Sequence, residues 1–260
     1  MAATTRPTII IVHGGWHTPA SYEKLTSALE ASGYEVHCPR LLSVNGARPP
    51  NAGLSDDTAL VRSYVESLVQ AGRSVVAIAH SYGGQVITNA LNALCGLGVD
   101  ARAAKGLKGG VSHLIYMAAF AIPEGVAMMD KVQEFGNMDL VPLAFDFADD
   151  GTCVSRDPKT LLVGPGPSDA EVEAYLKTLV RWHGNVMYRA SEHAAWREIP
   201  VAYIKASADM TVPVHYQQHF IDEMEKAGRK VQVFELDTGH CPNLTATDGV
   251  VDAVNKVVSG

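Results

Sequence analysis

Long apolar runs are missing from the sequence. Although 47% of the 260 residues are hydrophobic, no apolar stretch approaches the roughly 18 residues that a membrane-spanning helix needs. Residues 1–7 contain one arginine and lead directly into a short strand-like run, which is unlike the apolar segment of a signal peptide. We therefore expect a cytoplasmic protein with no membrane span.

A surplus of positive charge is also missing. The chain has 21 Lys and Arg residues against 28 Asp and Glu residues, a formal net charge of -7, and its basic residues are scattered. Nucleic-acid phosphates are neutralised by clustered basic side chains. Nucleic acid is therefore not an expected partner.

Cysteine is scarce. The four cysteines, Cys38, Cys95, Cys153 and Cys241, are far apart and include no CxxC pair. This spacing argues against both a zinc site and a disulfide framework. We expect reduced thiols, with at least Cys38 and Cys95 in the core, and no metal ion.

What the sequence does contain is a regular alternation of strand-like and helix-like segments. Short runs rich in β-branched residues predict the strands Thr8–Val12, Ser74–Ala79, His113–Ala118, Val201–Ala206 and Val231–Leu236. Periodic segments predict the helices Ser21–Ser32, Ser55–Gln70, Gly83–Leu97, Val214–Lys226 and Gly249–Val258. The alternation predicts an α/β fold, a mostly parallel sheet with helices on both faces.

One segment interrupts this alternation. Residues 122–198 contain an acidic loop, a stretch rich in proline and glycine, and one helix-like run, Asp169–Val180. We expect a single core formed by residues 1–121 and 199–260. Residues 122–198 would then be a lid inserted over the carboxyl edge of the sheet.

A serine stands in a sharp turn between a predicted strand and a predicted helix. The sequence AHSYGG at residues 79–84 has small residues, Ala79 and Gly83, two positions before and after Ser81, as such a turn requires. A serine held there projects its hydroxyl at the edge of the sheet. Ser81 is the predicted nucleophile, and an ordinary tight turn is the alternative.

A serine nucleophile needs a base to take its proton. His240, one of ten histidines, follows the last predicted strand in the loop DTGHCP, at the same edge of the sheet as Ser81. Enzymes with this type of elbow have their residues in the order serine, acid, histidine. This order predicts His240 as the general base.

The histidine in turn needs an acid that fixes its tautomer and stabilises the imidazolium. Asp209, in SADMTVP directly after the penultimate strand, is the predicted acid, with a helix cap or turn aspartate as the alternative. Glu124, after the strand that ends at Ala118, is the fallback. Asp237 is a poorer candidate, because it precedes His240 by three residues in the same loop.

Two glycines follow the first predicted strand, in HGGW. They allow backbone amides to approach a developing oxyanion, and the amides of Gly15 and Tyr82 are the predicted donors. Each donor of this kind typically lowers the barrier by roughly 3 kcal/mol. Phosphate binding is disfavoured, because the chain has neither GxGxxG nor a Walker lysine.

Four motifs in this order, HGGWHTPASYEKL, AHSYGG, SADMTVP and TGHCPNL, resemble the α/β-hydrolase superfamily over nearly the whole chain. Within it they resemble the branch of small esterases that contains plant methylesterases and hydroxynitrile lyases. The resemblance implies a lid between the strands near Ala118 and Val201. It implies the same site as the residues do, a triad of Ser81, Asp209 and His240 with an oxyanion hole at Gly15 and Tyr82.

This chain departs from the hydroxynitrile lyases of that branch at two positions. Those enzymes carry a threonine and a lysine where this chain has Gly14 and Cys241. Cyanohydrin cleavage is therefore disfavoured.

Together these residues predict a serine hydrolase that cleaves a carboxylic ester of a small or medium, apolar or aromatic substrate through an acyl-enzyme, without a cofactor. A lactonase, a thioesterase or a C–C bond hydrolase acting on a polyketide-like intermediate would use the same triad. A ligand receptor would use the same fold without turnover. The expected assembly is a monomer or a homodimer.

Further candidates for substrate contact lie beside the proposed site or are apolar residues of the lid: Trp16, His17, Met128, Phe135, Trp182 and Cys241. The alternative for the lid residues is that they fill the core of the lid itself. His80 is expected to be structural, because so sharp a turn should direct its side chain away from the face of Ser81.

Overall fold

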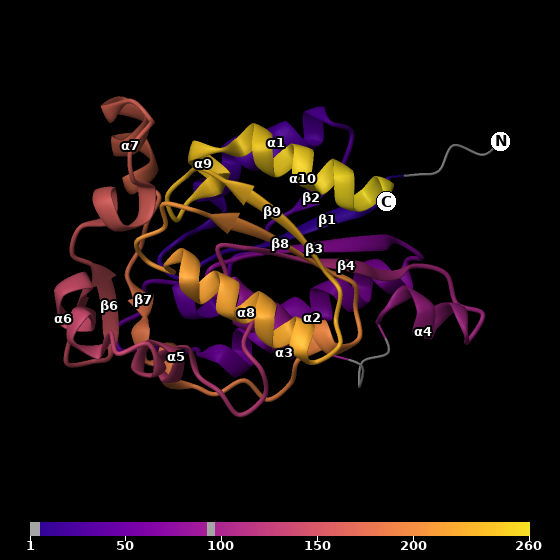
Figure 1. Cartoon of the computed structure of the whole chain (residues 1–260), viewed down its shortest axis with the longest axis horizontal. Coiled ribbons are helices and arrows are strands. Elements are labelled where there is room, and N and C mark those ends of the chain that lie inside the picture. Colours follow the sequence, from indigo (N-terminus) through magenta and orange to yellow (C-terminus); the bar gives the residue numbers. More distant parts are fainter. Residues whose placement is uncertain (1–5, 93–96) are drawn as a thin grey trace.

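The centre of the molecule is a parallel sheet, seen in a computed structural model that describes residues 6–92 and 97–260 (Figure 1). Within these residues its strands lie in the order β2-β1-β3-β4-β8-β9. Their bounds are β1 Thr8–Val12, β2 Glu35–His37, β3 Ser74–His80, β4 Gly110–Met117, β8 Val201–Ala206 and β9 Val231–Leu236. The predicted parallel sheet is confirmed. The short edge strand β2 was not predicted, because its three partly exposed residues form no apolar run.

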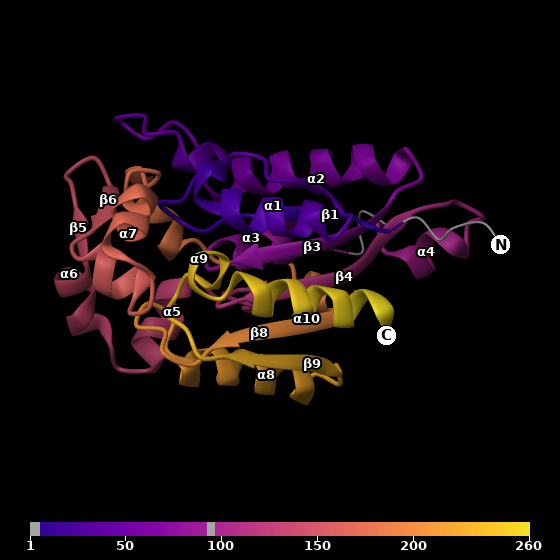
Figure 2. The same ribbon diagram turned by 90° about the horizontal axis from the view of Figure 1, so that it is seen from above.

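Helices cover both faces of the sheet, as Figure 2 shows. One layer consists of α1 (Glu23–Ala31) and α10 (Thr247–Ser259), and the other consists of α2 (Leu54–Gln70), α3 (Gly83–Ala90) and α8 (Val214–Lys226). Alternate residues of β1 serve the two layers: Ile9 and Ile11 pack with the first, and Ile10 and Val12 pack with the second. This two-sided burial explains the continuous apolar strand sequence.

The helix predicted over Gly83–Leu97 is shorter in the structure. α3 ends at Ala90, and residues 93–96 of the prediction, including Cys95, lie outside the described residues. The guanidinium of Arg62, on α2, donates to the carbonyls of Asn89 and Ala90 at 3.2 and 3.1 Å. A tertiary contact thus satisfies the end of the helix, and periodicity along the chain cannot reveal it.

The core position predicted for Cys38 is only partly correct. Cys38 is half-buried and packs against the edge of the core, because it follows the edge strand β2. Cys153 and Cys241 are the fully buried thiols among the described residues.

Residues 122–198 form a layer of short elements, whose buried side chains belong to the same apolar core as one face of the main sheet. They comprise a small antiparallel sheet in the order β5-β6-β7 and several short helices. The bounds are α5 Met128–Glu134, α6 Val141–Ala144, β5 Phe145–Phe147, β6 Thr152–Ser155, α7 Asp169–Leu176 and β7 Trp182–His183. Figures 1 and 2 show this layer beyond the end of the main sheet to which the strand arrows point. The small sheet was not predicted, because its strands are at most four residues long.

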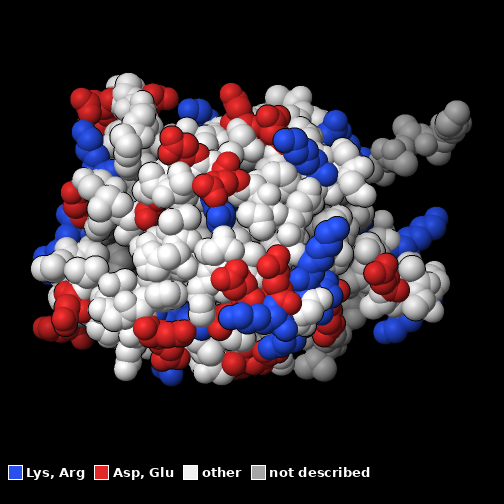
Figure 3. Space-filling view, viewed as in Figure 1, with Lys and Arg blue, Asp and Glu red and all other residues white. Residues whose placement is uncertain are grey.

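The surface shows no separation of charge by sign in the view of Figure 3, where acidic and basic side chains are interspersed.

Within residues 6–92 and 97–260, none of the helices has both the length and the apolar character needed to cross a membrane. The short helices α4 (Val99–Ala103) and α9 (Pro242–Thr245) complete the main fold.

The start of α3 lies directly against the end of β1. A Cβ added at Gly83 would be 2.1 Å from the carbonyl oxygen of Val12 and 2.8 Å from that of His13. Backbone therefore occupies the space that any side chain at position 83 would need. This close crossing sets the position of the turn that precedes the helix.

Replacing Gly83 by Ala should lower the free energy of unfolding by about 3 kcal/mol, the upper end of the usual cost of overpacking, because the backbone of β1 must move. Thermal unfolding measures the loss. Gly98→Ala is the matched control, since the nearest atom to an added Cβ there is 3.9 Å away. A Gly83→Ala variant with the midpoint of the wild type would contradict the packing described here.

Candidate active site

Ser81 occupies the sharp turn between β3 and α3. Its φ is 54°, a left-handed conformation that residues other than glycine rarely adopt. Its amide donates to the carbonyl of Met117 at 3.4 Å, and its own carbonyl accepts from the amides of Gly84 and Phe120 at 3.0 and 3.2 Å. Surrounding backbone therefore holds the strained turn in place. The residue is 6% exposed, so its surroundings exclude most water.

His240 and Asp209 form a buried pair. Nδ1 of His240 lies 2.7 Å from Oδ2 of Asp209, and both side chains are fully buried. Asp209 follows β8 and His240 follows β9. Because β3, β8 and β9 run in parallel, the loops that carry Ser81, Asp209 and His240 leave the same edge of the sheet.

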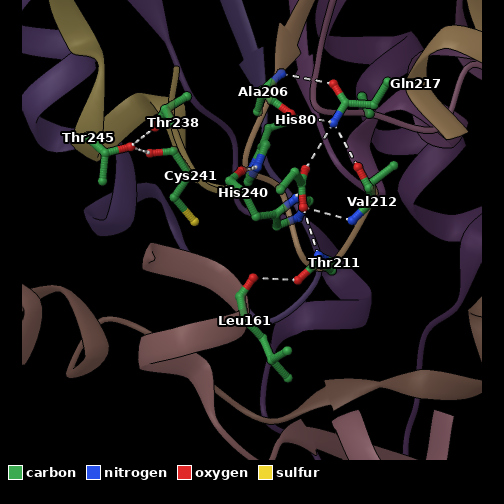
Figure 4. A network of polar contacts seen from close by, with 12 residues as sticks. His80, Leu161, Ala206, Thr211, Val212, Gln217, Thr238, His240, Cys241 and Thr245 are labelled. Carbon is green, nitrogen blue, oxygen red and sulfur yellow. Dashed lines mark hydrogen bonds and ion pairs between the residues drawn. The ribbon is translucent and has the colours of Figure 1, made fainter. Parts of the chain in front are cut away.

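The carboxylate of Asp209 is held by its own loop and by Gln217 of α8, whose hydrogen bonds to Ala206 and Val212 are seen in Figure 4. Oδ1 accepts from the amides of Thr211 and Val212, each at 2.8 Å. Gln217 donates to Oδ2 at 3.3 Å and to the carbonyl of Val212 at 2.7 Å, and its own oxygen accepts from the amide of Ala206 at 3.0 Å. Gln217 was not predicted. The sequence indicated it only indirectly, because Gln217 is a polar residue on the apolar face of the helix predicted over Val214–Lys226.

The second ring nitrogen of His240 is available for chemistry. Nε2 is buried and has no hydrogen-bond partner among the described residues. The backbone carbonyl of His240 accepts from Nε2 of His80 at 2.7 Å, and Nδ1 of His80 lies 2.5 Å from the hydroxyl of Tyr22. His80 therefore connects the loop of His240 to the turn that carries Ser81.

Both residues predicted to stabilise an oxyanion lie against the same indole ring. A Cβ added at Gly15 would be 2.5 Å from the ring of Trp182, and the rings of Tyr82 and Trp182 have their centroids 4.9 Å apart. Trp182 belongs to β7, so the 122–198 segment reaches the site. Trp16 packs edge-on against Trp182 and stacks on Phe145, with centroids 5.1 Å apart in each case.

His17 contacts both the loop of Gly15 and Cys241. Nδ1 of His17 is 2.7 Å from the carbonyl oxygen of Gly15, and Nε2 of His17 is 3.5 Å from Sγ of Cys241. Both residues are fully buried. The structure thus brings them to the proposed site, together with Trp16 and Trp182.

Met128 and Phe135 lie at the two ends of α5. Met128 is buried within the core. Phe135 stacks on Tyr216 of α8, with centroids 4.1 Å apart. The ring of Phe135 therefore packs between α5 and α8, and its role in substrate contact stays a prediction.

The alternative acids lie on the surface. Glu124 forms an ion pair with Arg197 at 2.9 Å, and the guanidinium holds the pKa of its carboxyl below the usual range. Asp237 accepts from the hydroxyl of Ser207 and does not fold back on His240. In the part of the chain that the structure describes, no three His, Cys, Asp or Glu side chains form a group suited to a metal ion.

A cluster of neutral histidines surrounds the buried pair. Burial lowers the pKa of His13 to about 4 and that of His17 to about 3, and it lowers the pKa of His80 well below the usual value. The nearby imidazole of His240 acts in the same direction on His17 and His80. The site therefore contains several imidazoles that stay uncharged at neutral pH.

A parallel sheet with a strained serine turn, and loops that meet at its carboxyl edge, is typical of the α/β-hydrolase class. The family model described as "Alpha/beta hydrolase family" matches residues 9–253, and the chain belongs to this family. The fold and family that the sequence motifs imply are thereby confirmed.

Individual proteins are also similar to this chain over nearly its whole length. A probable hydrolase of Phoma sp. is 29% identical over 255 residues, which cover 97% of this chain and 98% of that protein. Polyneuridine aldehyde esterase has the same fold, with a TM-score of 0.76 and 18% identity over 97% of this chain and 99% of that one. A methylesterase from Arabidopsis has a TM-score of 0.74 and 16% identity over 97% and 99% of the two chains.

The neutral histidines predict a loss of stability in mild acid. An imidazole in the unfolded chain titrates near pH 6.5, whereas folding keeps His13 neutral to about pH 4 and His17 to about pH 3. Below pH 6.5 the unfolded chain binds more protons, so the free energy of unfolding should fall as pH falls. Each of His13, His17 and His80 contributes up to about 1.4 kcal/mol per pH unit.

Urea unfolding at pH 7, 6 and 5 measures this slope. A His80→Gln variant removes one of the three groups, so its slope should be shallower by up to about 1.4 kcal/mol per pH unit, whatever its stability at pH 7. Equal unfolding midpoints for the wild type at pH 7 and pH 5 would contradict the prediction, because the folded protein would then take up as many protons as the unfolded chain over this range.

Proposed function

We propose that the chain is a serine hydrolase that cleaves carboxylic esters, with Ser81 as nucleophile, His240 as general base and Asp209 as the orienting acid. The observation that carries the proposal is Nε2 of His240, which has no hydrogen-bond partner within residues 6–92 and 97–260, on a ring whose other nitrogen is fixed by Asp209. A buried polar nitrogen without a partner is rare. Its natural partner is the hydroxyl of a nucleophile or a substrate.

The reaction would proceed in two steps. Oγ of Ser81 attacks the ester carbonyl while Nε2 of His240 takes its proton, and the negative charge of Asp209 stabilises the imidazolium. The carbonyl oxygen becomes an oxyanion that accepts from the amides of Gly15 and Tyr82. The imidazolium then protonates the departing alcohol. Water, deprotonated by the same imidazole, attacks the acyl-enzyme. The bond between Oγ and the acyl carbon then breaks, the imidazolium returns its proton to Oγ of Ser81, and the carboxylic acid leaves.

An apolar or aromatic substrate suits the aromatic side chains that pack beside the proposed oxyanion hole. Trp16, Trp182 and Phe145 pack together next to the residues proposed for the oxyanion hole. Trp182 and Phe145 come from the 122–198 segment, which we assign as the lid over the site. The similar proteins include an esterase and a methylesterase, which is consistent with ester cleavage.

The triad is tested by replacing one member at a time. Ser81→Ala and His240→Ala should each lower kcat for p-nitrophenyl butyrate by about 10⁶-fold, as loss of a nucleophile or base does. Asp209→Asn should lower kcat by about 10⁴-fold. Its amide group would keep the contacts of the loop but donate to Nδ1 of His240, so Nε2 would carry the proton and could not act as a base.

The acid assignment has a matched control in Glu124→Gln, which removes a carboxylate of the alternative acid on the surface. This variant should keep the activity of the wild type. Labelling with a fluorophosphonate should require Ser81 and His240 but not Glu124. A folded wild type that neither reacts with the fluorophosphonate nor turns over p-nitrophenyl esters would refute the proposed hydrolase.

A further inference from the structure

A carboxylate outside the proposed triad is buried close to the proposed oxyanion hole. Asp57, on α2, is 0% exposed and shares the buried face of this helix with Leu54, Val61 and Val65. Burial raises the pKa of this carboxyl, because taking a charge out of water disfavours the ionised form. Burying a carboxylate on an apolar helix face costs free energy, so the group requires polar partners.

The carboxylate of Asp57 accepts hydrogen bonds from Ser43 and Tyr82. The amide of Ser43 donates to Oδ1 at 3.0 Å, and the hydroxyl of Ser43 donates to Oδ2 at 2.5 Å. The hydroxyl of Tyr82 donates to the same Oδ2 at 2.7 Å. The two donor residues come from different parts of the chain: Ser43 from the segment after β2, and Tyr82 from the turn directly after Ser81.

The network continues from Ser43 to the lid. Nε1 of Trp182 donates to the hydroxyl of Ser43 at 3.2 Å. The ring of Trp182 then lies against both Tyr82 and Gly15, so closely that a Cβ at position 15 would be 2.5 Å from it. Asp57 is thus connected to both residues whose amides we assign to the oxyanion hole, to one by a direct hydrogen bond and to the other through Ser43 and Trp182.

We propose that Asp57 is a positioning residue that fixes the two halves of the oxyanion hole, through the hydroxyl of Tyr82 on one side and through Ser43 and Trp182 on the other. This inference rests on the proposed function. Asp57 does not reach the reacting atoms. It acts by holding backbone donors where the negative charge develops, and such donors are effective only when they are placed in advance.

The geometry gives this role a specific consequence. Removing the hydroxyl of Tyr82 leaves its backbone amide and its ring in place but releases the ring from Asp57. The ground-state ester carbonyl depends little on the hole, whereas the tetrahedral oxyanion depends on it strongly. Loss of the hydroxyl should therefore lower kcat and leave KM unchanged.

The test compares Tyr82→Phe with Tyr116→Phe. Tyr116 is equally buried, and its hydroxyl forms a hydrogen bond to Thr88 at 2.8 Å away from this network, so its loss controls for the removal of any buried hydroxyl. For Tyr82→Phe we expect kcat to fall about tenfold with KM within about twofold. The inhibition constant of butylboronic acid, which forms a tetrahedral adduct with a serine, should rise by the same factor. Tyr116→Phe should change neither quantity.

A double-mutant cycle with Ser43→Ala separates positioning from general stability. If both side chains act through Asp57, the loss of kcat in Tyr82→Phe/Ser43→Ala will be smaller than the product of the two single losses. Unfolding midpoints of all variants, measured in parallel, show whether kcat follows stability. Asp57→Asn, which keeps one oxygen as an acceptor, should retain more activity than Asp57→Ala.

The outcomes distinguish this proposal from the function on which it rests. If Ser81→Ala is inactive and Tyr82→Phe matches Tyr116→Phe in kcat and boronate affinity, the positioning role is wrong and the serine hydrolase stands. If Ser81→Ala keeps the turnover of the wild type and the wild type binds no boronate, the proposed function is wrong, and the positioning role is wrong with it.

Discussion

The close contact between the start of α3 and the end of β1 is the constraint on which the rest of the structure depends. Backbone fills the space beside Gly83, so the chain can pass from β3 into α3 only through a turn in which Ser81 has a positive φ. The same contact places the loop of residues 13–17 next to that turn. The contact thus places the turn of Ser81 and a glycine-rich backbone side by side, as the proposed nucleophile and oxyanion hole require.

Around this constraint the protein buries several polar side chains that pair with one another or with backbone. His80 joins the turn of Ser81 to the loop of His240, and Gln217 holds the loop of Asp209. Because His80 stays uncharged, a positive charge that forms on His240 during a reaction would meet one nearby negative partner, Asp209. Paired polar groups of this kind cost stability to bury but fix their geometry closely. That is the property required of a site whose donors and base act at fixed positions.

The sequence predicted those strands, helices and turns that depend on residues close together along the chain. The turn at Ser81 was predictable because a strand, small residues and a helix flank it in order. The loops of Asp209 and His240 were predictable because each follows a strand that ends at the same edge of the sheet. The buried contacts of these residues were not recognisable, because their partners are distant in sequence: Trp182 and Ser43 are 139 positions apart, and His80 and His240 are 160 apart. The end of α3 depends in the same way on Arg62. For Asp57 and Gln217 the sequence contained only a weak indication, namely that each is a polar residue on an otherwise apolar face of a helix.

The contact between Gly15 and Trp182 also restricts the order in which this chain could change. An indole occupies the place where a side chain at position 15 would begin, so the two positions compete for one volume. A residue larger than glycine fits at position 15 only if a smaller residue has already replaced Trp182. A tryptophan fits at position 182 only while position 15 is glycine. Lineages that share this fold would therefore be expected to exchange these two residues as a pair, one in the main fold and one in the inserted segment. Transplanting the segment between such proteins would succeed only between members with matching pairs.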